Sequence, residues 1–327
     1  MRKRKPIKNI LFSCVILILV LLMLYSGLRI LESTVFNPQQ DPDSTIASKT
    51  ILRDGVPYFP RQDITVVMLM GIDQYGKVEA SDAYTNTGAA DMVALLIFDD
   101  RDETCRVLGI NRDTMLEMPV LGIGGKVAGS YFGQLALSHT YGTGLEDSCE
   151  NTRNTVSKFL YGLRIDYYVA MNMDAIAILN DAVGGVTVTV EDDFSQINPD
   201  IPTGQVKLMG EQAIDFVRSR YGVGNQLNIS RMERQKAYIH GFMDSLGKAL
   251  EGGTGFALDT YEAVSPYIVT DCSWNVINGL MERYAEYDIA EIVSPEGENV
   301  RGEQYYEFYV DEDALDDLIL RLFYAPK

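Results

Sequence analysis

The N-terminal segment constrains the architecture most, because an uncharged apolar run of 19 residues extends from Ile10 to Leu28. A run of this length can cross a bilayer as one helix. Five basic residues precede it within residues 1–9, and the positive-inside rule keeps such a tail in the cytoplasm. The pattern predicts a single-pass protein of the cell membrane whose C-terminal domain is extracytoplasmic.

A cleaved signal peptide is the alternative interpretation of this segment. The apolar run is longer than the usual core of a signal peptide, and no small-residue cleavage box follows it between Leu28 and Phe36. We therefore favour a transmembrane anchor over residues 10–28.

The acidic balance excludes one class of partner. With 28 basic and 46 acidic residues, the formal net charge is −18, so most of the surface should repel a phosphate backbone. We expect no nucleic-acid partner, and any anion site must be a local cluster of basic residues. Only two histidines are present, which is too few for a histidine-rich metal centre and gives few candidates for the histidine of a Ser-His-Asp triad. Carboxylates and arginines should carry the chemistry.

The cysteines give a weak signal. Export would place Cys105, Cys149 and Cys272 in an oxidising space, but no C-x-x-C motif or zinc spacing is present. The sequence leaves open a Cys149–Cys272 disulfide, and three separate buried or free thiols is the interpretation that we favour.

Beyond the anchor, the pattern predicts a linker over 29–62 and an extracytoplasmic domain over 63–327, with residues 253–327 as its least defined part. Strand-like and helical patterns alternate along this domain, which is typical of an α/β fold, here an α/β/α layered domain with a mixed central sheet. The expected strands are 64–70, 92–98, 104–110, 167–171, 186–190 and 305–310, and the expected helices are 146–160, 173–183, 208–217, 230–252 and a last one containing Leu315 and Leu322.

Three strand ends carry the first group of polar residues. Asp73 follows the first strand, Asp91 opens the second, and Asn111-Arg-Asp-Thr114 ends the third. If the second and third strands form a hairpin centred near Arg101, opposed residue numbers sum to about 202, and Asp91 lies opposite Asn111. Two carboxylates and Arg112 at one sheet edge could bind magnesium and the phosphate oxygens of a substrate. A strand-end aspartate is, however, often only a turn former.

A second polar group surrounds the loop before the helix expected at 230–252. Arg218 and Arg220 could share one anion if the chain between them is extended. On the next helix, Arg231 and Gln235 are four residues apart and share a face, whereas Arg234 points elsewhere, so we expect Arg234 on the solvated surface.

These residues carry a resemblance to the LytR-CpsA-Psr family over about Ile64 to Gly252. The motifs, in order, are Gly71-Ile-Asp73, Ala90-Asp91-Met92, Asn111-Arg-Asp-Thr114, Ile165-Asp-Tyr-Tyr-Val169, Asp181-Ala-Val-Gly-Gly-Val186, Phe216-Val-Arg-Ser-Arg220 and Ser230-Arg-Met-Glu-Arg-Gln235. Such proteins have an α/β/α domain outside the membrane of mainly Gram-positive bacteria. They transfer a glycopolymer, such as teichoic acid or a polysaccharide, from a polyprenyl pyrophosphate carrier to peptidoglycan through a phosphodiester.

The resemblance implies specific roles for the residues that match. It makes Asp73 and Asp91 ligands of Mg²⁺ or Mn²⁺, and it places the polyprenyl tail in an apolar tunnel between sheet and helices. It assigns catalysis to Asp91, Arg112 and Arg220, and pyrophosphate binding to Arg112, Lys126, Arg218, Arg220, Arg231 and Gln235.

Two positions depart from the family's pattern. Ala89 stands where an arginine is frequent, and Asn228 stands where an acid is frequent. Asn228 cannot act as a general base, and asparagine at a helix start is also a good N-cap.

The sequence thus predicts a membrane-anchored phosphotransferase of cell wall biogenesis, acting on a polyprenyl pyrophosphate-linked glycopolymer with peptidoglycan as acceptor. The alternatives are a pyrophosphatase that passes the same substrate to water, and a non-catalytic protein that binds lipid pyrophosphate or wall polymer.

Overall fold

The structure is a computed structural model that describes residues 50–224, 228–250, 255–273, 276, 279, 280, 283, 284 and 287–326. The predicted cytoplasmic tail, the predicted membrane anchor over 10–28 and most of the predicted linker lie outside these residues. Among the helices that are described, none has the length and apolar character needed to cross a membrane.

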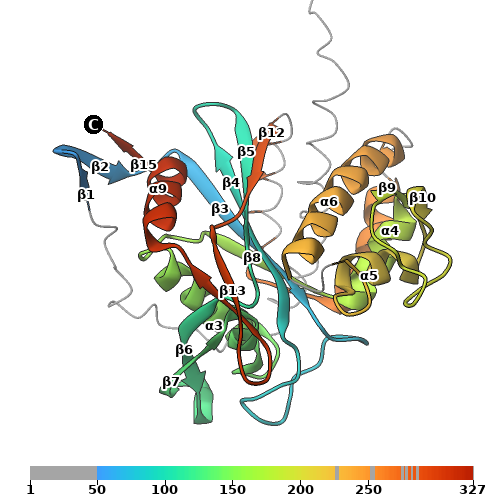
Figure 1. The fold of residues 1–327 in the computed structure, drawn as a ribbon, viewed down its shortest axis with the longest axis horizontal. Helices are drawn as coiled ribbons and strands as arrows, with labels where there is room; N and C mark the ends of the chain where they lie inside the picture. Colours follow the sequence, from blue (N-terminus) through green and yellow to red (C-terminus); the bar gives the residue numbers. More distant parts are fainter. Residues whose placement is uncertain are drawn as a thin grey trace, which may run out of the picture.

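A six-stranded mixed sheet forms the centre of the fold, in the order β11-β8-β3-β4-β5-β12 (Figure 1). The middle pairs β3–β4 and β4–β5 are antiparallel, whereas β8 runs parallel to β3 and β12 runs parallel to β5. The strands are β3 (Ile64–Ile72), β4 (Ala90–Asp99), β5 (Thr104–Ile110), β8 (Tyr167–Asn172), β11 (Ile268–Thr270) and β12 (Asp288–Val293). A mixed α/β fold with a mixed central sheet is therefore confirmed.

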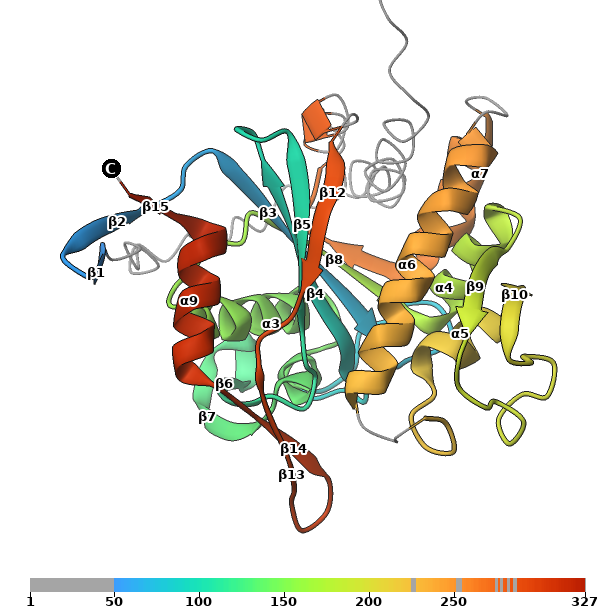
Figure 2. The same cartoon turned by 45° about the horizontal axis from the view of Figure 1, so that its top comes forward.

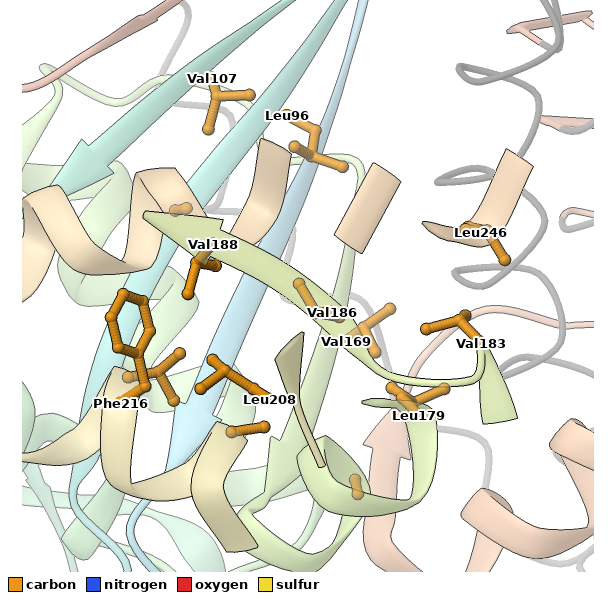
Figure 3. Close-up of a cluster of buried hydrophobic side chains, with 14 of the residues drawn as sticks. Leu96, Val107, Val169, Leu179, Val183, Val186, Val188, Leu208, Phe216 and Leu246 are labelled. Atoms are coloured by element: carbon orange, nitrogen blue, oxygen red, sulfur yellow. The ribbon is translucent and has the colours of Figure 1, made fainter. Parts of the chain in front are cut away.

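Helices cover both faces of this sheet. Along β4, Leu96 and Phe98 face one core and Leu95 and Ile97 face the other, as the two-residue period of a strand requires. The first core is closed by α4 (Met173–Ala182), α5 (Glu211–Arg218) and α6 (Asn228–Leu250), together with the hairpin β9 (Val186–Val190) and β10 (Gly204–Leu208) (Figure 3). The second is closed by α3 (Glu146–Phe159) and α9 (Glu312–Phe323), and α7 (Gly255–Val264) packs against α4.

Two sequence-based details are wrong. In the β4–β5 hairpin, Val93 pairs with Ile110 and Phe98 with Cys105, so opposed numbers sum to 203 and Asp91 is not opposite Asn111. The helix expected at 208–217 begins only at Glu211, because Leu208 ends strand β10 and Gly210 interrupts the chain at positive φ.

The chain between the predicted anchor and the domain is not all linker. Residues 51–60 form strands β1 (Ile51–Arg53) and β2 (Val56–Pro60), and β2 pairs with β15 (Tyr324–Pro326) near the C-terminus. Just after β2, Arg61 donates both Nη atoms to the buried Asp99, at 2.6 and 2.5 Å. The incoming chain is thus bound to the end of the central hairpin.

Two hairpins extend from the sheet. One is β6 (Met115–Leu121) with β7 (Val127–Gln134), and the other is β13 (Gly297–Arg301) with β14 (Tyr306–Val310), which projects from the lower edge in Figure 2. Residues 288–326 supply β12 at one edge of the central sheet, the β13–β14 hairpin and helix α9, so the C-terminal part is integral to the domain.

The described cysteines, Cys105, Cys149 and Cys272, are three separate buried thiols with no disulfide between them, as we favoured. Burial raises the pKa of each thiol, so they behave as inert core residues.

Candidate active site

A β-bulge directs Asp91 to the site. In the β3–β4 ladder, Gly71 pairs with Met92 and Ile72 with Ala90, so Asp91 is an extra residue with no partner in this ladder. In a regular strand, the odd-numbered Asp91 would face α3 and α9 with Val93, but a bulge re-aims the side chain. Asp91 instead contacts Arg231 on α6, on the opposite face of the sheet.

Asp91 lies between two arginines. Arg231 Nη1 donates to Asp91 Oδ2 at 3.0 Å, and Arg112 Nη1 donates to Asp91 Oδ1. Arg231 Nη2 also donates to the Asp91 carbonyl at 3.2 Å and to Asn228 Oδ1. Arg231 is 2% exposed, so its charge is removed from water and needs these partners.

The loop after β5 supplies a second buried carboxylate. Asn111 Oδ1 accepts from the Asp113 amide at 3.0 Å, and Thr114 Oγ1 donates to the Asn111 carbonyl at 2.6 Å, so the loop folds as a local side-chain-stabilised turn. Asp113 is fully buried and accepts from Arg220 and from Gln134 Nε2. Burial raises the pKa of Asp113, and the neighbouring Arg220 and Arg112 oppose that rise.

A third acid-arginine pair lies at the end of β3. Arg218, the last residue of α5, donates through Nε and Nη2 to the two carboxylate oxygens of Asp73, at 2.9 and 3.3 Å. This hydrogen-bonded pair raises the pKa of Arg218. Arg218 and Arg220 therefore contact different carboxylates, with Ser219 in extended conformation between them.

The charges of the inner cluster do not balance. Among the described residues, the carboxylates that contact Arg112, Arg220 and Arg231 are those of Asp91 and Asp113. Burial lowers the pKa of Arg231, and the nearby Arg112 contributes to that shift. Within the described part of the chain, the buried Nε of Arg231 has no hydrogen-bond acceptor, and Arg112 Nε lies 3.4 Å from Asp113 Oδ1 without the geometry of a hydrogen bond. Surplus positive charge and unused donors are what an anionic ligand requires.

Two carboxylates are available to a metal ion. Asp73 and Asp91 lie at the ends of the adjacent strands β3 and β4. The Asp73 amide donates to the Ala89 carbonyl at 2.9 Å, which holds these two strand ends together. Both carboxylates are held by arginines, and no group of three or more His, Cys, Asp or Glu side chains suited to a metal occurs in the described residues. Two carboxylates suit Mg²⁺ when substrate phosphates supply further oxygens, so this donor set fits a metal bound together with its substrate.

An apolar cavity adjoins the cluster. Asp91, Arg218, Arg231 and Gln235 line it beside apolar residues that continue along the sheet to Leu96 and beneath α6. From Asp91 to Leu96 a strand covers about 17 Å at ~3.3 Å per residue. The cavity therefore presents polar groups where Asp91 lies and an apolar wall along the rest of β4.

The adjacent α6 residues Arg234 and Gln235 have different surroundings. Gln235 lines the apolar cavity and donates to the Val217 carbonyl at 3.1 Å. Arg234 is buried, which makes its predicted surface position wrong: it donates to the Phe216 and Ser219 carbonyls and to Asp192, and it stacks over Phe194. Its side chain holds the end of α5 and Ser219 against α6.

Lys126 is separate from these residues. It is exposed on the β6–β7 hairpin, and in the described residues it makes no hydrogen bond or ion pair with the arginine cluster.

Sequence reasoning missed the connections around Asn111. Asn228 Nδ2 donates to Asn111 Oδ1 at 2.6 Å while Asn228 Oδ1 accepts from Arg231, so the Asn228 side chain links two site elements. The β13–β14 hairpin supports the same loop, because the Phe308 amide donates to the Asp113 carbonyl at 2.9 Å and Arg220 stacks over Tyr306. Only the Asn111-Arg-Asp-Thr114 motif itself gave a signal for Asp113.

Known proteins are similar to this chain over most of its length. The model of the LytR_cpsA_psr family matches residues 35–322. The chain is 25% identical to the polyisoprenyl-teichoic acid–peptidoglycan teichoic acid transferase TagU of Bacillus licheniformis, over 98% of this chain and 97% of that protein. It is 27% identical to TagU of Enterococcus faecalis, over 84% and 82% of the two chains.

Solved structures share the fold. Protein gbs0355 of Streptococcus agalactiae matches with a TM-score of 0.64 and 21% identity, over 80% of this chain and 86% of that chain. A structure described as TagT bound to LI-WTA matches with a TM-score of 0.58 and 22% identity, over 84% and 95%.

Proposed function

The chain belongs to the LytR-CpsA-Psr family, and on that premise we propose that it is a membrane-anchored transferase that moves a glycopolymer from a polyprenyl pyrophosphate carrier to peptidoglycan. Relatives named teichoic acid–peptidoglycan transferases support the reaction class. The observation that carries the proposal is the buried arginine cluster beside an apolar cavity, since it suits a ligand with an anionic head and an apolar tail.

In this proposal the pyrophosphate occupies the arginine cluster. Arg112, Arg220 and Arg231 bind its oxygens as charged donors, and Arg218 and Gln235 bind from the mouth of the apolar cavity, which receives the tail. Lys126 would reach the ligand only from the β6–β7 hairpin. Asp91 holds Arg112 and Arg231 in place until the ligand arrives.

The transfer itself needs little covalent help from the protein. An acceptor hydroxyl oxygen attacks the phosphorus that bears the polymer, the new O–P bond forms, and the bridging P–O bond to the polyprenyl phosphate breaks. In a loose transition state the new O–P bond is little formed, so the acceptor hydroxyl keeps its proton until late in the transfer and the proton then passes to water. Arg112 and Arg220 neutralise charge on the leaving phosphate. A Mg²⁺ or Mn²⁺ ion held by Asp73 and Asp91 would add Lewis-acid stabilisation of the phosphate oxygens.

The location outside the cytoplasm is part of the proposal. The basic tail and the apolar run of residues 10–28 support a single membrane anchor. The acceptor and the lipid carrier then meet at the outer face of the cell membrane.

Product analysis tests the function. The full chain in detergent would be incubated with a glycan-loaded prenyl pyrophosphate and Mg²⁺, with and without peptidoglycan fragments. A phosphodiester-linked product that requires the acceptor supports transfer. Release of phosphorylated glycan regardless of acceptor indicates a pyrophosphatase, and tight donor binding without product indicates a binding protein.

A further inference from the structure

We propose that a second cavity, which we call the hairpin cavity, binds a sugar of the glycan acceptor. It lies between α6 and the β13–β14 hairpin. The inference rests on the proposed function, in which peptidoglycan is the acceptor. Its volume is about 620 Å³, inside the ~300–1,000 Å³ range of ligand sites.

A buried amide points to a ligand in this cavity. Asn111 lines the hairpin cavity and is 3% exposed, yet its Nδ2 has no hydrogen-bond acceptor among the described residues. Its Oδ1 is fully used, since it accepts from Asn228 Nδ2 and from the Asp113 amide. An unused buried donor is costly, so a group in the cavity that accepts a hydrogen bond would relieve that cost. A sugar hydroxyl oxygen is such an acceptor.

The hairpin cavity is connected to the arginine cluster. Asn111 immediately precedes Arg112, and Asn228 joins Asn111 to Arg231. A small third cavity beneath α6 is lined by Asp91 and Gln235, which also line the apolar cavity, and by Met232 and Ser294, which also line the hairpin cavity. A sugar in the hairpin cavity would therefore be beside the proposed pyrophosphate position and on the other side of α6 from the tail.

The negative charge of the cavity lining disfavours the pyrophosphate-bearing donor substrate. Four carboxylates (Glu233, Glu296, Glu298 and Asp311) and a single ammonium, Lys236, surround the hairpin cavity. A pyrophosphate would be repelled here, whereas sugar hydroxyls can donate to carboxylate oxygens.

An aromatic surface completes the subsite. Tyr309 lines the cavity and is 43% exposed, and the buried Phe308 lies beside it in the sequence. The C–H face of a sugar ring is apolar and packs on an aromatic ring without loss of its equatorial hydroxyl contacts. Tyr309 is outside the arginine cluster, so it can be changed without altering the proposed catalytic groups.

Calorimetry of the full chain in detergent tests the proposal with two probes, chitotetraose and inorganic pyrophosphate with Mg²⁺. Tyr309→Ala should weaken chitotetraose binding about tenfold, the loss expected for one aromatic stacking contact, and should leave pyrophosphate binding unchanged. Tyr305→Ala is the matched control, because Tyr305 is on the same hairpin and 42% exposed but does not line the cavity. Thermal unfolding of both variants checks that they fold.

The outcomes separate this inference from the proposed function. Selective loss of chitotetraose binding in Tyr309→Ala supports the subsite. Equal binding in both tyrosine variants, or pyrophosphate binding by the wild type with no chitotetraose binding, overturns the subsite and leaves the donor site standing. Chitotetraose binding that depends on Tyr309 without any pyrophosphate binding would support the sugar site and contradict the donor function.

Discussion

Two arginines on α6, three residues apart, should fail in opposite ways when changed to alanine. Arg234→Ala removes the donor from the Phe216 and Ser219 carbonyls and leaves Asp192 without its partner. An unsatisfied buried acceptor costs about 1–3 kcal/mol, so two carbonyls, partly reached by water in the variant, should cost about 3 kcal/mol in the free energy of unfolding. For a domain of this size that lowers the unfolding temperature by roughly 6–12 °C.

Arg231→Ala should instead cost mainly ligand binding. The Asp91 carbonyl and Asn228 Oδ1 lose a donor in this variant, but Asp91 keeps Arg112 as a partner. Removal of Arg231 also ends the burial of its charge and its repulsion by Arg112, so the loss of stability should be smaller than in Arg234→Ala. Loss of a buried charged contact to the pyrophosphate costs about 2–5 kcal/mol, which weakens binding at least ~30-fold.

Differential scanning fluorimetry and pyrophosphate calorimetry on both variants decide the matter. Each variant is the control for the other, since the two share a helix and a charge change. An Arg234→Ala protein with wild-type unfolding temperature and lost pyrophosphate binding, beside an Arg231→Ala protein that binds normally, would refute the assignment of the two helix faces.

Four further predictions rest on other parts of the molecule. Mg²⁺ should strengthen pyrophosphate binding in the wild type but not in Asp91→Asn by calorimetry, and equal affinity with and without metal in the wild type would contradict the metal site. Protease added to intact protoplasts should remove the domain after residue 29, and a protected domain would reverse the orientation. Cys105, Cys149 and Cys272 should react with a thiol reagent only after unfolding, because burial raises the pKa of each thiol, and a Cys149–Cys272 bridge in the mass spectrum would contradict the three separate buried thiols. Burial alone would raise the pKa of Asp99, but hydrogen bonds from Arg61 and Arg106 hold that pKa well below its usual range, so the ionised carboxylate stabilises the fold above about pH 4 and this contribution is lost as the pH falls through the folded pKa. In urea unfolding between pH 7 and pH 3, the free energy of unfolding should therefore fall less steeply with acid in Asp99→Asn than in the wild type, and identical slopes would count against this.

The sequence predicted the layers of the fold well, because its signals are local periods. The strand at 104–110 and the hairpin to 92–98 follow from continuous apolar runs around a short acidic turn, and they are observed. The register was one residue off, because pairing depends on the geometry of the turn at Asp100–Glu103, which the apolar pattern does not report.

The site was harder to predict, because it depends on contacts between distant elements. A bulge at Asp91 leaves no mark on the apolar pattern, yet it decides which face of the sheet the carboxylate occupies. Arg234 was misplaced because the helix-face argument considered only α6 itself, while the chain leaving α5 covers a second side of that helix.

Asn228 illustrates how such contacts change the meaning of one residue. An aspartate there could still accept from Arg231, but it could not donate to Asn111 Oδ1 as Asn228 Nδ2 does. If the Asn111 amide turned over to donate to that aspartate, its Oδ1 would leave the Asp113 amide, which shapes the loop that carries Arg112. The amide at position 228 is therefore matched to the orientation of Asn111, and in that same orientation Asn111 Nδ2 has no acceptor among the described residues, in a side chain that lines the hairpin cavity. A residue that looks like a missing base is, in this chain, part of the connection between the arginine cluster and the proposed acceptor site.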